Sequence, residues 1–160
     1  MCIRDSCATE GHAADSDNDG ASVPCFDLFL RLMKEEKYKD LLFGDISAVC
    51  AFRRVPQLIA LLQATDIHSR LVYGSDYPVP AINLVVHTSK LKRFGMITDE
   101  ECNALNDLYN YNPLLFDVAS KRLLRGPNGE QFPASVFKAH PNLPPYRSHE
   151  QVEPVLLVPH

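Results

Sequence analysis

Two short apolar segments limit what this chain can fold into. The segments LLFGDISAV (41–49) and RLVYGS (70–75) are strand candidates, and between them Pro56 opens a stretch with apolar residues at helical spacing. A strand, a helix and a strand in this order predict a βαβ unit with parallel strands. Because parallel strands are buried on both faces, two of them cannot form a stable sheet alone. We therefore expect the carboxyl-terminal end of a larger α/β protein.

Local signals predict further helices on both sides of this unit. Ser22 and Pro24 open an amphipathic pattern over residues 26–40, and a second one over residues 81–95 ends at Gly95. Two more helices follow; the first begins with a capping box and the second with a proline. Their signals are Thr98 with Glu101, for a helix to about Tyr111, and Pro113, for a helix in PLLFDVASKRLL (113–124).

The two ends of the chain lack such periodicity. Residues 7–24 are small, acidic and turn-forming, which predicts a long loop. Residues 126–160 hold seven of the 12 prolines and predict an irregular, extended arm. Residues 1–6, MCIRDS, resemble a translated sequencing adapter, so we expect them to be non-native. We therefore expect an α/β unit over residues 7–125, preceded by the non-native residues 1–6 and followed by the arm of residues 126–160.

Composition excludes several classes of protein. The 160 residues are 46% hydrophobic and 22% charged, which is typical of one globular domain. A net charge of -4 without a basic stripe argues against nucleic acid as a partner, and no apolar run approaches the ~18 residues that span a membrane. The five cysteines are odd in number and form no CxxC pair, which favours free thiols and a cytoplasmic location and argues against a structural zinc site.

The segment DSDNDG (15–20) suggests a calcium loop. Asp15, Asp17 and Asp19 match the first half of an EF-hand, but the motif needs Glu at its twelfth position, where this chain has Phe26. No helical pattern precedes the segment either. We expect an acidic, solvated loop and keep the calcium module as the alternative. Signatures of serine hydrolases, P-loop proteins and dinucleotide-binding proteins are absent from the sequence.

Asp76 is the strongest candidate for a functional residue. It follows the apolar strand 70–75 in a turn framed by prolines. Aspartate is common in turns, so the residue can be simple punctuation between a strand and a helix. A carboxylate at the carboxyl end of a parallel strand is also well placed to bind a metal or to move a proton. The residues alone leave both interpretations open.

The segments LVYGSDYPVP (71–80) and GMITDEECNALNDLYNYNPLLFDVASKRLLR (95–125) together resemble the amidohydrolase superfamily, in its amidohydrolase-related (amidohydrolase 2) branch. The resemblance covers roughly residues 7–125. It implies the carboxyl-terminal part of a (β/α)8 TIM barrel, with strands seven and eight at 41–49 and 70–75 after a truncated strand six. CATEG (7–11) resembles the residues that follow a ligand histidine in this family, so that histidine and an earlier His-x-His pair are expected upstream.

The resemblance also implies a chemistry. A divalent metal, zinc with manganese or iron as alternatives, would activate water to hydrolyse a C–N or C–O bond of a small molecule. Asp76 would be a metal ligand and the general base. Non-oxidative decarboxylation in the same branch and a non-catalytic α/β fragment are the alternatives, and a homo-oligomer is left open.

Five residues follow as candidates for substrate binding. Glu10 and His12 lie after the expected strand six, Asp45 lies on strand seven, Arg53 follows it, and Tyr77 adjoins Asp76. Three of them also have a plain interpretation: an exposed loop histidine for His12, a polar interruption of a strand for Asp45, and the cap of a surface helix for Arg53.

Overall fold

The computed structural model describes residues 3–6, 11–51, 53–82 and 86–138. Within them the fold is mixed α/β, with two small sheets and no closed barrel. The strands are β1 (Ile3–Ser6), β2 (His12–Asp15), β3 (Ala21–Pro24), β4 (Leu42–Asp45) and β5 (Leu71–Val72). The helices are α1 (Cys25–Lys34), α2 (Val55–Gln63), α3 (Thr88–Arg93), α4 (Asp99–Tyr111) and α5 (Pro113–Leu123). Short 3-10 helices are η1 (Glu36–Tyr38), η2 (Ser47–Cys50), η3 (Thr65–Arg70), η4 (Val79–Ala81) and η5 (Ala134–Phe137).

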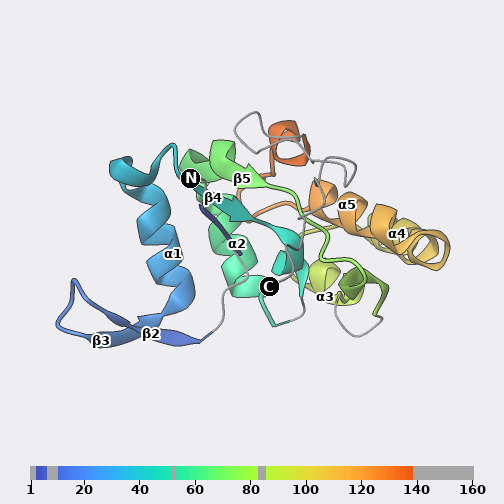
Figure 1. The fold of residues 1–160 in the computed structure, drawn as a ribbon. Helices are drawn as coiled ribbons and strands as arrows, with labels where there is room; N and C mark the ends of the chain where they lie inside the picture. The colour runs from blue at the N-terminus through green and yellow to red at the C-terminus, as the bar shows by residue number, and fades with distance from the viewer. Residues whose placement is uncertain (1–2, 7–10, 52, 83–85, 139–160) are drawn as a thin grey trace, which may run out of the picture.

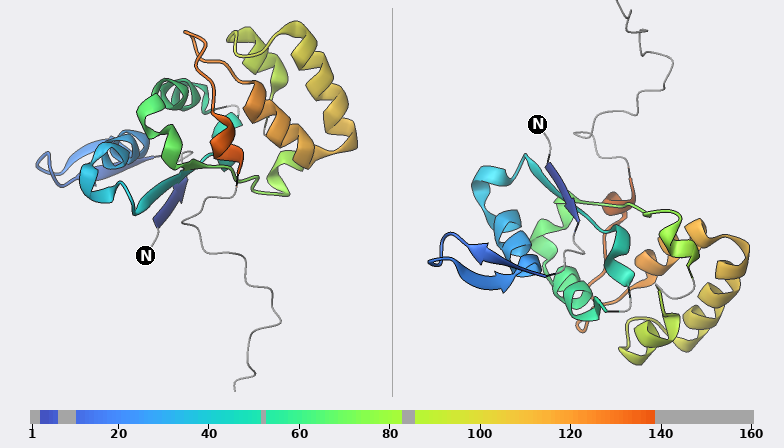
Figure 2. Two further views of the ribbon diagram at one scale, coloured as in Figure 1. Left: turned by 90° about the horizontal axis from the view of Figure 1, so that it is seen from above. Right: turned by 60° about the horizontal axis from the view of Figure 1, so that its bottom comes forward.

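The predicted parallel pair is present, and a third strand joins it. The sheet order is β1-β4-β5, with β4 parallel to both neighbours and with Gly44 and Asp45 opposite Leu71 and Val72. The first strand candidate is shorter than predicted, since η2 follows β4 after one residue. β1 comes from residues 1–6, the segment that we expect to be non-native. Its pairing with β4 does not test where these residues come from, so the expectation stays a prediction. The sheet and α2 lie in the middle of the molecule, between α1 on one side and α3, α4 and α5 on the other (Figures 1 and 2).

One continuous apolar core joins these layers. Side chains of α1, β4, α2, α3, α4 and α5 are buried in it. The largest include Met33, Ile46, Leu58, Leu61, Leu62, Leu91 and Phe116. The apolar stripes of the predicted helices therefore meet in one place. No helix of the described ranges is long and apolar enough to cross a membrane.

The prediction of a long loop over residues 7–24 is wrong for its described part. Residues 12–24 form the antiparallel hairpin β2–β3, which packs on α1. Its turn uses Asp19 and Gly20 at positive φ (48° and 75°), and the carbonyl of Asp15 accepts from the Gly20 N–H at 2.9 Å. Ser22 therefore lies in a strand and does not cap α1, which begins after Pro24 without a side-chain cap.

The predicted helix over residues 81–95 is too long. Of the described residues in this range, only those of α3 form an α-helix, and Val86 lies in an isolated antiparallel bridge with Ala51. Residues 83–85 lie outside the described residues. The end of this helix is confirmed: Gly95 has φ 69° and its N–H donates to the Lys92 carbonyl at 2.8 Å.

The two following helices agree with their signals. Thr98 caps α4 in a complete capping box with Glu101, and Pro113 stands in the first turn of α5 behind the Asn112 cap. Residues 126–133 are irregular, as predicted for the arm, but residues 126–138 are not extended. These residues fold back over β5, with Phe132 and Val136 buried and the Val136 carbonyl accepting from the Tyr73 N–H at 2.8 Å. The apolar residues of this segment are too far apart in the sequence to show a periodic pattern, yet Phe132 and Val136 still pack into the core. Residues 139–160 lie outside the described residues.

Candidate functional site at the carboxyl ends of β4 and β5

Parallel pairing brings the ends of β4 and β5 to one edge of the sheet. Asp45 and Val72 are register partners, and the Ile46 N–H continues the ladder by donating to the Val72 carbonyl at 3.0 Å. The segments that leave the two strands therefore start side by side. Asp45 is the last residue of β4, and Asp76 lies on the segment that leaves β5, so the sheet positions both residues at the same edge.

Asp76 is held in an unusual backbone conformation. Its φ is 49°, in the left-handed region, where aspartate is tolerated better than most residues other than glycine. Its carbonyl accepts from the Val79 N–H at 2.8 Å, and Ser75 Oγ accepts from the Tyr77 N–H at 3.2 Å. The Tyr77–Pro78 peptide bond is cis. The Asp76 side chain is exposed, so a ligand can reach this carboxylate.

A small cavity lies beneath Asp76. Its volume is about 10 Å³, roughly the space that one water molecule needs. Two carboxylates, Asp76 and Asp117, line it together with Ser47, Cys50 and Ser75. Carboxylate oxygens beside a space of this size can accept hydrogen bonds from a water molecule or take its proton.

A buried ion pair from α5 supports this region. Lys121 Nζ donates to Asp117 Oδ2 at 2.7 Å, and both side chains are almost fully buried. Tyr73 Oη donates to the same oxygen at 2.9 Å, and the Lys121 ammonium lies 4.9 Å from the Tyr73 ring centre. The three side chains therefore form one connected group between α5 and the end of β5.

The electrostatics of this group follow from its burial. Burial raises the pKa of Asp117 above its usual value; the charge of Lys121 opposes this shift, and the negative charge of Asp76 adds to it. Burial also raises the pKa of the Cys50 thiol to about 12 and raises that of the Tyr73 hydroxyl. Cys50 and Tyr73 are thus neutral at pH 7, and of the two carboxyl groups that line the cavity Asp117 is buried and Asp76 is exposed.

Sequence reasoning missed Asp117 and Lys121. Their spacing, four residues apart on a predicted helix, is typical of a surface ion pair, and lysine is rarely fully buried. The signal that could have found them is their position on the helix. They lie on the face of α5 that also carries the buried Phe116 and Ser120.

The other predicted residues of strand seven and of the Asp76 turn lie nearby but do not line the cavity. Asp45 is buried, and its Oδ1 accepts from the Ser47 N–H at 2.8 Å, as a residue that shapes the strand end does. Arg53 is exposed in the turn before α2. Tyr77 is 63% exposed, so it does not form a packed wall beside the cavity. The substrate-binding roles of these residues stay predictions.

The two predicted residues after strand six are not brought to Asp76. His12 is exposed in β2, in the hairpin beside α1, while α3–α5 lie at the other side of the molecule (Figure 2). Glu10 lies outside the described residues. Their assignment as substrate-binding residues stays a prediction.

In the acidic segment DSDNDG, the carboxylates of Asp15 and Asp17 interact with Arg31 and do not form a calcium loop. Arg31 of α1 donates through both terminal nitrogens to Asp15 Oδ1 and Oδ2 at 2.7 Å each. This bidentate pair holds the pKa of Asp15 below its usual value. Phe26, at the twelfth position, is buried in the core. Strands rather than helices flank the turn, so the geometry disagrees with an EF-hand.

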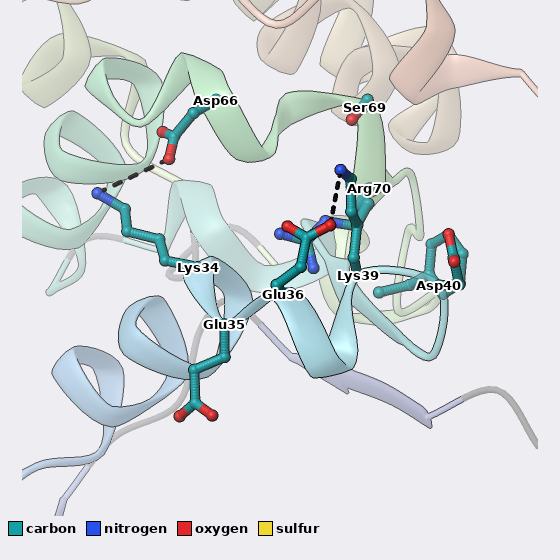
Figure 3. A pocket seen from close by; sticks show the side chains of 9 residues that line it. Lys34, Glu35, Glu36, Lys39, Asp40, Asp66, Ser69 and Arg70 are labelled. Carbon is teal, nitrogen blue, oxygen red and sulfur yellow. Dashed lines mark hydrogen bonds and ion pairs between the residues drawn. The ribbon is translucent and has the colours of Figure 1, made fainter.

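A larger pocket lies at the opposite ends of the strands. It has a volume of about 360 Å³, and Asp40 and Arg70, which directly precede the β4 and β5 regions, line it with η1 and the end of α1. Two ion pairs lie in the pocket: Lys34 Nζ is 3.9 Å from Asp66 Oδ2 and Lys39 Nζ is 3.0 Å from Glu36 Oε1 (Figure 3). Arg70 Nη1 is buried without a hydrogen-bond partner in the described part of the chain. The pocket thus carries charges of both signs, and it lies at the ends of the strands opposite to Asp76.

The described residues around Asp76 supply too few ligands for a complete metal site. An exposed carboxylate is a good ligand for a divalent cation, and Asp76 is one. Across the described residues, however, no group of three or more His, Cys, Asp or Glu side chains could hold a metal ion. Further ligands would have to come from outside these residues.

No family model matches this sequence, and comparison with curated proteins and with solved structures also finds no match.

Proposed function

We propose that this chain is the carboxyl-terminal part of a metal-dependent, amidohydrolase-like TIM-barrel enzyme. It would hydrolyse a C–N or C–O bond of a small molecule. The observation that carries the proposal is Asp76: an exposed carboxylate, in a left-handed turn, at the carboxyl end of a strand in a parallel sheet. In barrels of this kind the active site is built from the loops at that end of the strands.

The order of the parallel strands supports the barrel. β4 and β5 are adjacent and parallel, with α2 between them along the chain, as two consecutive barrel strands are. Under the resemblance they correspond to strands seven and eight. β1 also pairs with β4 in parallel, but it comes from residues 1–6, which we expect to be non-native, so it is not counted as a barrel strand.

The backbone at Asp76 supports a functional role. A residue other than glycine at positive φ stores conformational strain, and such residues are concentrated at active sites and ligand-binding turns. The rigid strand before the turn fixes the carboxylate more firmly than a surface loop would. Asp76 would hold a cation through one oxygen and accept a proton from water at the other. Asp45 would shape the neighbouring strand end through its bond to the Ser47 N–H.

A divalent metal, zinc or else manganese or iron, would supply a polarised, more acidic water at this edge. Asp76 is the residue of this chain that would bind it. The remaining ligands are expected in the parent, in an upstream His-x-His pair and in a histidine at the position before Cys7, where this chain has Ser6 of the segment expected to be non-native.

The experiment is to recover the full reading frame and assay its product. An upstream His-x-His pair, a histidine before CATEG and metal-dependent turnover of ester, lactone or amide substrates would support the proposal. A reading frame without these histidines would contradict it. Release of carbon dioxide from aromatic or unsaturated carboxylates, with no hydrolysis, would replace it with the decarboxylase alternative.

A further inference from the structure

The ammonium group of Lys121 contacts the backbone of the Asp76 turn directly. Lys121 Nζ donates to the Gly74 carbonyl at 2.9 Å, two residues before Asp76. The same nitrogen donates to Asp117 Oδ2, and Tyr73 Oη donates to that oxygen as well. One buried cation therefore connects α5 to the two residues where β5 turns into the Asp76 segment.

Fold stability alone is a poor explanation for this arrangement. A lysine with none of its side chain exposed has lost its hydration, and a buried ion pair often contributes no more to stability than apolar residues of the same size. Methionine and leucine would fill the same position on α5 without that loss. What an apolar residue cannot do is hold a carbonyl group in one direction.

The direction of the Gly74 carbonyl matters for Asp76. A peptide group is planar, so fixing the Gly74 carbonyl also fixes the plane that leads into Ser75. The next constraints are local, from Ser75 Oγ to the Tyr77 N–H and from the Asp76 carbonyl to the Val79 N–H. Lys121 therefore connects this local turn to α5 and fixes its position relative to that helix.

We propose that Lys121 is a positioning residue for Asp76. Held by Asp117 and Tyr73, it fixes the Gly74 carbonyl and so the direction in which the strand delivers the Asp76 carboxylate to the cavity edge. The importance of this role for chemistry rests on the proposed function of Asp76. The geometric part, that Lys121 immobilises the turn, does not.

Three variants of the full chain test the geometric part. Lys121→Met removes the donor but leaves Asp117 as an unpaired buried charge. Asp117→Asn/Lys121→Met removes both charges and keeps an acceptor for Tyr73 Oη, so this variant remains folded. Lys92→Met is the matched control, because Lys92 is a half-exposed lysine whose nitrogen lies 3.6 Å from Asp99, remote from Gly74 in sequence and on α3.

The measurement is amide hydrogen exchange of two peptides, residues 71–82 and residues 99–111. In the double variant the first peptide should exchange about tenfold faster or more, since a released turn opens locally, while α4 keeps its protection. Lys92→Met should leave both peptides unchanged. Unchanged exchange of residues 71–82 in the folded double variant would overturn the proposal, and so would equal acceleration of both peptides, which indicates a purely structural role.

Kinetics of the full-length enzyme separate the two proposals. If Asp76 acts as proposed, the double variant should lose about tenfold or more in kcat with KM within about twofold, as expected for a misdirected catalytic group. If Asp76→Asn keeps wild-type turnover, the proposed function fails while the exchange result still decides the role of Lys121. Wild-type kcat in a double variant with a mobile turn would refute positioning for catalysis.

Discussion

Asp45 and Val72 are register partners at the carboxyl ends of two parallel strands. This pairing places the Asp45 carboxylate and the turn that carries Asp76 at one edge of the sheet. The two aspartates differ in setting: Asp45 is buried and bonded to the Ser47 N–H, whereas Asp76 is exposed in a left-handed turn. The difference predicts a structural role for the first and a chemical role for the second.

Asp45 can be tested through stability. Asp45→Ala would leave the buried Ser47 N–H without its acceptor, so the free energy of unfolding should fall by about 1–3 kcal/mol. Asp45→Asn keeps an oxygen at that position and should cost much less. Urea denaturation of both variants measures the difference. Equal losses in the two variants would show that the charge, rather than the acceptor, is what the strand end needs.

The capping box of α4 predicts a dependence of stability on pH. Arg125 donates two hydrogen bonds to Glu101 at 2.7 Å each and, with the Thr98 N–H, lowers the pKa of Glu101 to about 2. Because this pKa is lower in the folded chain, the stabilisation is full above the ordinary value of 4.5 and is lost as pH falls toward about 2. Glu101→Gln should therefore reduce the free energy of unfolding at pH 7 by about 1–2 kcal/mol.

The control for this prediction is Glu100→Gln, in the same helical turn but exposed. It should change stability by about 0.5 kcal/mol or less. Chemical denaturation from pH 7 to pH 2 should show the curves of wild type and Glu101→Gln converging at low pH. A constant difference between them across this range would contradict the assignment of the ion pair.

The segment DSDNDG should not bind calcium usefully. Both oxygens of Asp15 are occupied by Arg31, and Phe26 stands where the bidentate glutamate of an EF-hand is required. Titration calorimetry of the chain with calcium should detect no binding at micromolar concentrations. A dissociation constant of about 1 µM or tighter would restore the calcium-module interpretation.

The three-stranded sheet predicts self-association. Within the described residues, β1 pairs only with β4, so its other edge has no strand partner. Unpaired edges recruit other chains, which should give a mass above the 17.9 kDa of one chain, rising with concentration. Size-exclusion chromatography with light scattering measures this. A constant monomer mass with a cooperative thermal transition would show that the chain is a complete folding unit.

Elements defined by their own residues could be predicted from the sequence. The capping box at Thr98, the proline at residue 113 and the glycine at residue 95 act through local backbone chemistry, and the structure confirms them. The parallel pair β4–β5 follows equally from the order of strand, helix and strand. Asp76 was identified for the same reason, since its position at a strand end is visible in the sequence.

Elements that depend on distant partners could not be predicted. The hairpin β2–β3 is too polar to suggest strands, and its strand-end residue Asp15 is bound by Arg31 from α1. The packing of Val136 depends on the N–H of Tyr73, far away in the sequence. Lysine is usually exposed, so the burial of Lys121 could not be predicted. Its partner Gly74 is 47 residues away in the sequence and comes close only in the folded chain.

The most direct test of the central claim is turnover by Asp76→Asn in the full-length protein. Asparagine tolerates the left-handed conformation and keeps one ligating oxygen, but it cannot accept a proton. The account predicts a fall in kcat of ~10² or more with folding intact, and a much smaller loss for Asp45→Asn. Near-wild-type turnover of Asp76→Asn, with its bound metal unchanged by elemental analysis, would contradict it.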